Sequence, residues 1–493
     1  MKAKALSKDT AGSRPFDACI VGSGPNGLAA AALLAQKGAR VLVLEARESA
    51  GGGMRTEELT LPGFAHDICS AAHPMGVLSP FLATLPLAAH GLEWRTGDHS
   101  AAHPLDGEPA VLLRKSVVET AAGLDAGDER AYAKLLEPLL KYPAGLLADA
   151  LGPLTKIPRH PILMARFGLL GIRSASALAR SRFRGERARA LLAGCAAHSV
   201  LPLSHRLTSA LGLMFLITGH MSDWPVARGG SIAIARALIA YIESLGGEIR
   251  VSSPVRTLAD VPPARVILFD TSPEQLVAIA GDELPTLYKR RLGRYRYGPG
   301  VFKLDLALDG PIPWSDPAVN RASTVHVGGR LGEIAAAEAA MWRGEHPEQP
   351  FVMVVQQSEL DEERAPRGKH TGYAYCHVPA GSTVDMTDAI EKQIERFAPG
   401  FRDRILARHK MYAGDLQKHN ANYIGGAITG GVADLPQAFL RPIARWNPYA
   451  TPNPRIFLCS SATPPGGGVH GMCGYYAGLS AARRLGLDPE PAF

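Results

Sequence analysis

The first 45 residues carry the clearest pattern of apolar and polar positions in the chain. The apolar stretch Phe16–Val21 predicts a short buried strand, and residues 40–44 (RVLVL) predict a second one. Between them lie a glycine-rich turn and residues 28–38 (LAAAALLAQKG), whose small and apolar residues predict a closely packed helix. The order strand, glycine turn, helix, strand predicts a parallel βαβ unit.

The glycine turn has the spacing G-x-G-x-x-G, at Gly22, Gly24 and Gly27. Gly22 permits the tight turn, Gly24 lets the backbone approach a pyrophosphate, and Gly27 lets the helix pack closely on the sheet. The N–H groups at the helix N-terminus attract phosphate, and Glu45, which ends the second strand, is placed to accept hydrogen bonds from a ribose diol. A glycine-rich turn without a nucleotide is the alternative, but the position of Glu45 favours a dinucleotide site.

Later segments repeat parts of this pattern. Residues 82–219 are rich in Leu and Ala with interspersed Arg, which predicts an inserted helical domain or cap. A second Rossmann-like stretch begins at 229–231 (GGS), with a helix and buried strands at 248–251 and 265–270. The interval 301–308 alternates between apolar and polar residues and predicts a half-buried strand.

The last strand–turn–helix unit also contains glycines, including Gly466, Gly468 and Gly471. Their spacing is formally a second G-x-G-x-x-G, but no strand with a terminal acid follows it. We therefore expect this unit to direct the N-terminus of its helix toward the same cofactor, and not to form a second dinucleotide site. His470 lies in this turn, either as an added hydrogen-bond donor or as a brace for the loop.

Composition and charge narrow the choice of partners. The 493 residues carry a formal charge of +7, with 46% hydrophobic and 20% charged residues and a mean hydropathy of +0.01. This length predicts about two domains. Because no run of Lys and Arg stands out, we expect no nucleic-acid partner, whereas peripheral contact with an anionic membrane stays open.

The cysteines and the N-terminal residues indicate the cellular compartment. The six cysteines show neither a C-x-x-C pair nor metal-ligand spacing, which predicts free thiols in a reducing compartment and no metal site. Residues 1–15 have no apolar core and predict a disordered tail, not a secretory signal. The apolar run 209–218 is too short to span a membrane. We expect a cytoplasmic protein, either soluble or peripheral to a membrane.

Three stretches resemble a known family. They are VGSGPNGLAAAALLAQKGARVLVLEARESAGGG near the N-terminus, GGSIAIARALIAYIESLGGEIRVSSPV in the middle and IFLCSSATPPGGGVHGMCGYYAG near the C-terminus. Together they resemble the phytoene-desaturase-related (phytoene dehydrogenase-like) FAD-dependent oxidoreductases, within the amine-oxidase-type flavoprotein superfamily.

The resemblance implies an α/β fold in which a Rossmann-type (amine-oxidase/GDI-like) FAD-binding domain is interleaved with an α+β substrate-binding domain. The FAD-binding domain is expected at 16–80, 222–285 and 450–493, and the substrate or cap domain at 81–221 and 286–449. Non-covalent FAD is the implied cofactor. The motif residues and the resemblance together give these expected FAD contacts: Gly22, Gly24, Gly27, Glu45, Gly52, Arg55, Val255, Ser461, Gly468, Val469 and Met472.

Three departures from the family pattern affect this site. Gly51-Gly52-Gly53 stands where the family has Gly-Gly-Arg, so the phosphate-facing arginine is missing or replaced by Arg55. The segment after Val255 is too short for the family's usual hairpin. Ser460-Ser461 stand where smaller residues are usual.

The expected activity is oxidation or desaturation of an apolar organic substrate, isoprenoid, lipid-like or amine, by hydride transfer to the flavin, with oxygen or a quinone as electron acceptor. A saturase or isomerase that uses reduced flavin is one alternative, and a non-catalytic, GDI-like lipid-binding chaperone is another. No catalytic triad or paired carboxylates appear, so the catalytic residues are unknown. Candidates are His470, Lys303 and Asp305; the last two share one face of the strand at 301–308, and a solvent-exposed ion pair is their alternative.

Overall fold

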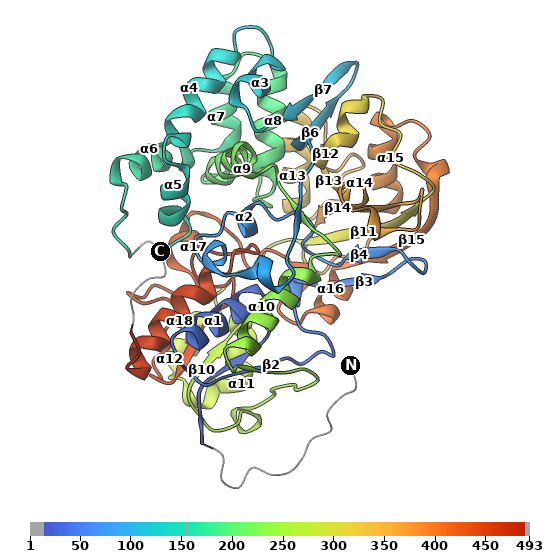
Figure 1. Ribbon diagram of the computed structural model, residues 1–493. Helices are drawn as coiled ribbons and strands as arrows, with labels where there is room; N and C mark the ends of the chain where they lie inside the picture. Colours follow the sequence, from blue (N-terminus) through green and yellow to red (C-terminus); the bar gives the residue numbers. More distant parts are fainter. Residues whose placement is uncertain (1–13, 154, 489–493) are drawn as a thin grey trace.

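The chain forms two sheets with a helical layer, and the computed structural model describes residues 14–153 and 155–488 (Figure 1). The predicted tail at 1–15 lies, up to residue 13, outside the described residues. In Figure 1 the parallel sheet lies at the bottom, the second sheet lies above it, and the helical layer covers the upper left.

The first sheet has five parallel strands in the order β16-β10-β1-β2-β9. Their bounds are β1 Phe16–Val21, β2 Val41–Leu44, β9 Glu248–Arg250, β10 Ala264–Phe269 and β16 Ile456–Leu458. Consecutive residues of a strand face opposite sides, so Ile20 and Leu268 pack into one apolar cluster and Val21 and Phe269 into another. Both faces are therefore covered, which is why these strands are almost wholly apolar. The α/β fold with a Rossmann-type core is confirmed.

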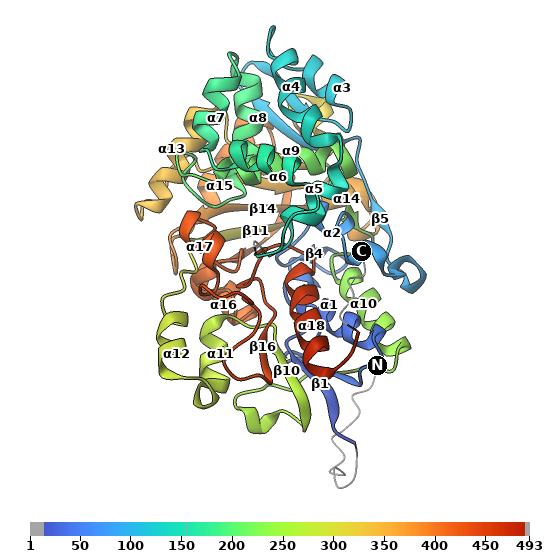
Figure 2. The same cartoon turned by 90° about the vertical axis from the view of Figure 1, so that its left-hand side faces the viewer.

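Three helices cover one face of this sheet: α1 (Pro25–Gln36), α10 (Ile232–Ser244) and α18 (Met472–Leu485). Helices α1 and α18 lie side by side in Figure 2. A Cβ on Gly474 would lie 1.8 Å from the carbonyl oxygen of Asn26, so the small residue is needed for this close approach. Helices α11 (Pro273–Ala280) and α12 (Thr286–Leu292) cover the opposite face.

The second sheet has seven strands in the order β15-β11-β14-β13-β12-β6-β7, antiparallel except where β12 meets β6. Their bounds are β6 His99–Leu105, β7 Glu108–Leu113, β11 Gly300–Leu308, β12 Ala322–Val327, β13 Val352–Val355, β14 His370–Val378 and β15 Ile405–Met411. The predicted alternation in β11 is observed: Phe302 and Leu304 pack with α15 (Thr387–Phe397), whereas Lys303 and Asp305 lie on the opposite face. The prediction of a half-buried strand was wrong, because both faces of β11 are buried: on the second face Val301 packs with Ile68 and Ala307 with Phe64.

The helical layer comes from the segment that was predicted to be a helical cap. It consists of α3 Val117–Ala122, α4 Glu129–Leu140, α5 Pro143–Ala150, α6 Pro161–Gly171, α7 Ala175–Arg182, α8 Glu186–Ala197 and α9 Thr208–Ser222. The prediction of helix from residue 82 was wrong over β6 and β7, which add two strands to the second sheet. The sequence HSAAHPL of β6 does not alternate and has few β-favouring residues, so its pairing with β12 decides its structure.

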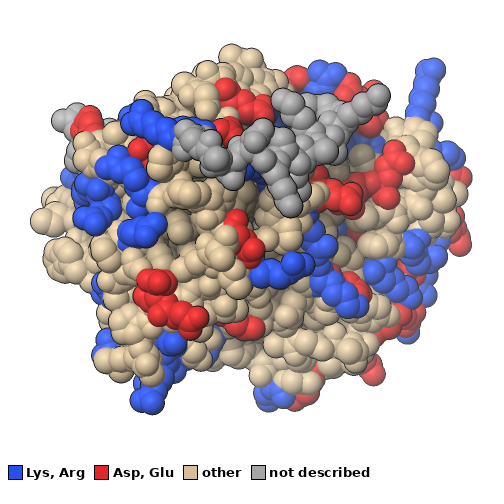
Figure 3. Space-filling view, turned by 90° about the horizontal axis from the view of Figure 1, so that it is seen from below, with Lys and Arg blue, Asp and Glu red and all other residues tan. Residues whose placement is uncertain are grey.

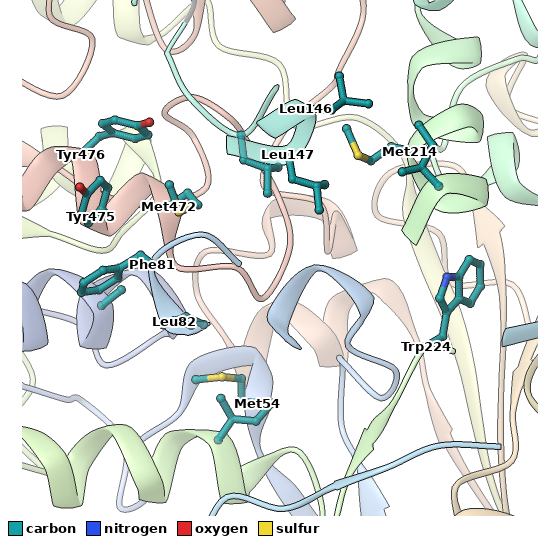
Figure 4. Close-up of a cluster of buried hydrophobic side chains, with 14 of the residues drawn as sticks. Met54, Phe81, Leu82, Leu146, Leu147, Met214, Trp224, Met472, Tyr475 and Tyr476 are labelled. Carbon is teal, nitrogen blue, oxygen red and sulfur yellow. The ribbon is translucent and has the colours of Figure 1, made fainter. Parts of the chain in front are cut away.

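The largest apolar cluster joins these layers. Figure 4 shows part of it, where Leu147 of the helical layer lies on the side of Met472 of the first layer and Leu146 lies beside Met214. Within residues 14–153 and 155–488, no helix combines the length and apolar character needed to span a membrane. On the face seen in Figure 3, basic and acidic side chains are interspersed.

Candidate functional site

A cavity of about 810 Å³ lies between the glycine turn of the first sheet and one face of the second sheet. This volume lies within the usual range of about 300–1,000 Å³ for ligand sites. Of the expected cofactor contacts, nine line it: Gly22, Gly24, Glu45, Gly52, Arg55, Val255, Ser461, Gly468 and Val469. The fold therefore brings together residues that lie more than 400 positions apart in the chain.

The three glycines of the motif leave no room for side chains. Gly22 has φ +101°, a conformation that favours glycine, and a Cβ on Gly24 would lie 2.5 Å from the Oδ2 atom of Asp270. A Cβ on Gly27 would lie 2.2 Å from the carbonyl oxygen of Gly22. Gly27 does not line the cavity; it lets the start of α1 pack against the turn, which is the role that the sequence indicates.

Glu45 is buried at the end of β2 and accepts several hydrogen bonds. Its Oε2 atom accepts from the backbone N–H of Ser23 at 3.2 Å, and its Oε1 atom accepts from the backbone N–H of Arg47 at 2.9 Å. Arg55 pairs with the same carboxylate, Nη2 to Oε1, at 3.2 Å. The guanidinium of Arg55 thus lines the cavity beside Glu45, at the end where the ribose is expected.

The backbone at Gly52 comes close to the motif turn. Gly52 has φ +56°, and a Cβ there would lie 2.9 Å from the Cα atom of Gly24. Val255 lines the same end of the cavity, in an irregular segment between β9 and β10 that contains one short 3-10 turn, Leu258–Asp260. An elongated cradle of glycine backbone with a carboxylate at one end fits a dinucleotide.

The glycine loop before α18 forms another wall. Gly468 has φ +133° and lines the cavity with Val469, but the buried Met472 does not line it. Two of the first N–H groups of α18 have protein acceptors: Met472 N–H donates to Nδ1 of His470 at 3.0 Å, and Gly474 N–H to Oδ1 of Asn26 at 3.5 Å. These two groups are therefore not free to meet a cofactor.

His470 is turned away from the cavity. Its side chain is buried, it is not among the lining residues, and burial lowers its pKa to about 4, so the ring is neutral at physiological pH. Its hydrogen bond to Met472 matches the alternative in which His470 braces the loop. The geometry gives it no direct role at a reacting atom.

Lys303 and Asp305 form a buried ion pair, so the alternative of a solvent-exposed pair is wrong. Neither residue lines the cavity, whereas Tyr373 does, and the Lys303 ammonium is 4.4 Å from the centroid of the Tyr373 ring. Asp305 also lies 3.7 Å from Nδ1 of His66, and the Lys303 charge holds the pKa of the Asp305 carboxyl low against the opposing effect of burial. The pair supports the wall behind Tyr373.

Asp270 was not singled out in the sequence. It follows β10, accepts a hydrogen bond from the N–H of Gly27 at 2.9 Å and lines the cavity. Burial raises the pKa of its carboxyl to about 7, and the neighbouring Glu45 charge acts in the same direction. The signal in the sequence was its position directly after a buried strand whose neighbour carries the glycine turn.

Arg441, which follows α17 (Leu435–Leu440), was also missed. It is 4% exposed and lines the cavity, and its Nη2 atom donates to the Tyr295 hydroxyl at 3.2 Å and to the Gly431 carbonyl at 3.3 Å. Its Nε atom has no partner, and it forms no ion pair with any described carboxylate. A buried, unpaired cation is costly, so this position favours a bound anion.

The far wall of the cavity is one face of the second sheet. Because β13 and β14 pair in register, Met353 lies opposite Tyr375 and Val355 opposite Tyr373, and all four line the cavity. Among the described lining residues the carboxylates are Glu45 and Asp270, both at the glycine turn. Across residues 14–153 and 155–488, no group of three or more His, Cys, Asp or Glu is arranged to hold a metal ion.

Comparison with known proteins agrees with this arrangement. Residues 20–84 match the family described as NAD(P)-binding Rossmann-like domain. The mouse pyridine nucleotide-disulfide oxidoreductase domain-containing protein 2 is 26% identical over 95% of this chain and 94% of its own. The neurosporene-forming phytoene desaturase of Rhodobacter capsulatus is 24% identical over 99% of this chain and 96% of its own.

A solved structure shows the same fold. Wild-type putrescine oxidase bound to putrescine has a TM-score of 0.62 at 18% identity, over 95% of this chain and 98% of that one. The resemblance found in the sequence is thus confirmed along almost the whole chain: this oxidoreductase is similar to a phytoene desaturase in sequence, and it has the fold of the amine-oxidase-type flavoproteins.

Proposed function

We propose that the protein oxidises or desaturates an apolar organic substrate by hydride transfer to non-covalently bound FAD. The observation that carries this proposal is the continuity of one cavity, from the glycine turn and Glu45 to the apolar side chains of the second sheet. A dinucleotide at the first end and an apolar molecule at the other would share one water-poor space.

Different residues along this cavity would bind the cofactor and the substrate. Gly22, Gly24 and Gly52 leave room for the pyrophosphate, and Glu45 would accept from the ribose diol. When bound, FAD supplies the two-electron acceptor. Arg441 offers a fixed positive charge, while Tyr373 and Tyr375 would confine the substrate.

The lining residues support an apolar substrate over an amine. An ammonium ion in a buried cavity needs a carboxylate partner, and the described carboxylates lie at the cofactor end. The relation to the R. capsulatus phytoene desaturase points the same way. The alternative of a GDI-like chaperone is disfavoured because such a protein would not need the glycine cradle and the buried Glu45.

The experiment that tests this function is anaerobic reduction of the purified holoprotein. An apolar substrate, searched for among isoprenoids and lipids, should bleach the oxidised flavin, and oxygen or a quinone should restore it. NADH and NADPH should not bleach it rapidly or saturably, because the chain has only one complete dinucleotide unit. Rapid bleaching by NADPH would favour the reduced-flavin saturase or isomerase, and a protein that cannot take up FAD would refute both.

Exposed apolar side chains support the proposal that this protein contacts a membrane surface in the cytoplasm. Ile157, Ile162 and Leu169 of the α6 region are 87%, 87% and 74% exposed, and Arg166 on the same helix is also exposed. Apolar and basic side chains on one surface helix favour an anionic bilayer interface. Flotation with anionic vesicles, compared with an Ile162→Glu/Leu169→Glu variant, tests this contact.

Asp270 predicts a pH dependence of FAD binding. The carboxyl, with a pKa of about 7, is largely neutral below pH 7 and ionised above it. An ionised Asp270 beside the glycine turn would repel the pyrophosphate, so FAD affinity should be highest below pH 7 and fall above it, by up to about tenfold per pH unit. Isothermal titration of the apoprotein with FAD between about pH 6 and 9 measures this dependence. Asp270→Asn should flatten the slope, and an equal slope in wild type and variant would contradict the assignment.

A further inference from the structure

The end of the cavity farthest from the glycine turn contains polar atoms without partners. Ser199 Oγ, Trp224 Nε1 and Thr324 Oγ1 are buried and have no hydrogen-bond partner in the described part of the chain, and all three residues line the cavity. Burial without a partner costs free energy, so such atoms in a native fold call for an explanation.

The backbone that carries two of these side chains is in an unfavourable conformation. Val200, which follows Ser199, has φ +53°, and Asp223 and Trp224 have φ +53° and +43°. None of these residues is glycine, and left-handed conformations of this kind are costly and concentrate at functional sites. The backbone is thus strained both next to Ser199 and at Trp224, where these polar atoms face this end of the cavity.

The three residues form one group with His198. The His198 ring stacks on Phe215 with centroids 4.1 Å apart and lies 5.6 Å from the Trp224 ring. Its Nε2 atom lies 3.0 Å from Nε2 of His326, which is two residues from Thr324 and hence on the same face of β12. We call His198, Ser199, Trp224 and Thr324 the distal polar cluster.

The distal polar cluster carries no net charge at neutral pH. Burial lowers the pKa of His198 to about 3 and that of His326 well below its usual value, so both rings are neutral. The indole N–H can only donate, and the two hydroxyl groups can donate as well. The cluster therefore suits an uncharged hydrogen-bond acceptor, and it carries no charge that would neutralise a carboxylate or an ammonium ion.

We propose that the distal polar cluster binds a single uncharged oxygen function, a hydroxyl or a carbonyl, on an otherwise apolar substrate. In Figure 4 the indole nitrogen of Trp224 lies on the edge of the ring that is turned toward the middle of the view. The neighbouring lining residues Leu211, Phe215 and Met353 would contact the apolar skeleton. This inference rests on the proposed function and narrows its substrate class from apolar molecules in general to those with one neutral oxygen group.

The test compares probes that share a skeleton. Equilibrium dialysis of the FAD-replete protein would measure the binding of farnesol, of the hydrocarbon farnesene and of farnesylamine, which is charged at pH 7. Farnesol should bind at least about tenfold more tightly than either of the others, since each hydrogen bond to a buried unpaired group is favourable. Thr324→Val and Ser199→Ala should each reduce the preference for farnesol over farnesene several-fold, without changing the affinity for farnesene.

Thr371→Val is the matched control. Thr371 Oγ1 is also buried and without a partner, but Thr371 does not line the cavity, so its variant should keep the full preference for farnesol. Equal binding of farnesol and farnesene by the wild type would overturn the proposal, and so would tighter binding of farnesylamine. Because every sample contains FAD, these results would leave the flavin-dependent function intact, whereas failure to bind FAD would be seen before any probe is added.

Discussion

Gly24→Val should give a folded protein that binds its flavin much more weakly. A Cβ at this position would lie 2.5 Å from Oδ2 of Asp270, which is itself held by the N–H of Gly27. The added methyl groups would also occupy the path of the pyrophosphate along the turn. Overpacking of this kind costs about 1–3 kcal/mol, so FAD should bind about ten- to a hundredfold more weakly. Absorbance of the purified protein and titration with FAD measure the change.

The same substitution at an open position separates loss of the cofactor from loss of the fold. Gly168 in α6 has no atom within 4 Å of an added Cβ and no positive φ, so Gly168→Val should keep the wild-type flavin content. Circular dichroism should show the same helical content in both variants. A Gly24→Val protein that stays fully loaded would show that the cofactor does not follow this turn.

The N-terminal unit was predictable because its signals are local. The turn, the helix and the strand that ends at Glu45 lie within about thirty residues, and each glycine has a steric reason that can be stated from the motif alone. The alternation in β11 could be predicted as easily, because apolar residues at every second position indicate a strand without any knowledge of its partner strand. The structure reproduces the N-terminal unit and the alternation in β11, but it buries β11 on both faces, where the sequence predicted a half-buried strand.

Long-range contacts decide what could not be predicted. The strand β6 exists because β12 pairs with it from more than 200 residues away, against the preference of its own sequence. Lys303 and Asp305 were correctly placed on one face, but Tyr373, which lines the cavity where they do not, comes from another strand. Arg441 has no motif around it, and the only signal for Asp270 was its position after a buried strand, so the fold is needed to bring the two residues to the glycine loop and the cofactor end.

Arg441→Met should lower the reduction potential of the bound flavin. Because two N–H groups at the start of α18 already have protein acceptors, the helix offers less positive charge than the sequence indicated. Arg441 supplies a full charge near the same loop: a Cβ on Gly466 would lie 2.1 Å from its Nη1 atom, and Gly467 and Gly468 line the cavity beside it. A reduced flavin is more negative than an oxidised one, so a fixed cation stabilises the reduced form.

The expected size follows from the strength of charged hydrogen bonds. One such bond contributes about 1.5–3 kcal/mol, which for a two-electron couple corresponds to a shift of about 30–60 mV. Equilibration with reference dyes would measure the potential of wild type, Arg441→Met and Arg441→Lys, and the lysine variant should keep most of the wild-type value because it keeps the charge. A side chain that only supported the loop would change stability and leave the potential of the loaded protein where it was. An FAD-replete Arg441→Met with the wild-type potential would therefore contradict this role. A lower potential in Arg441→Met but not in Arg441→Lys would show that the effect comes from the buried charge itself.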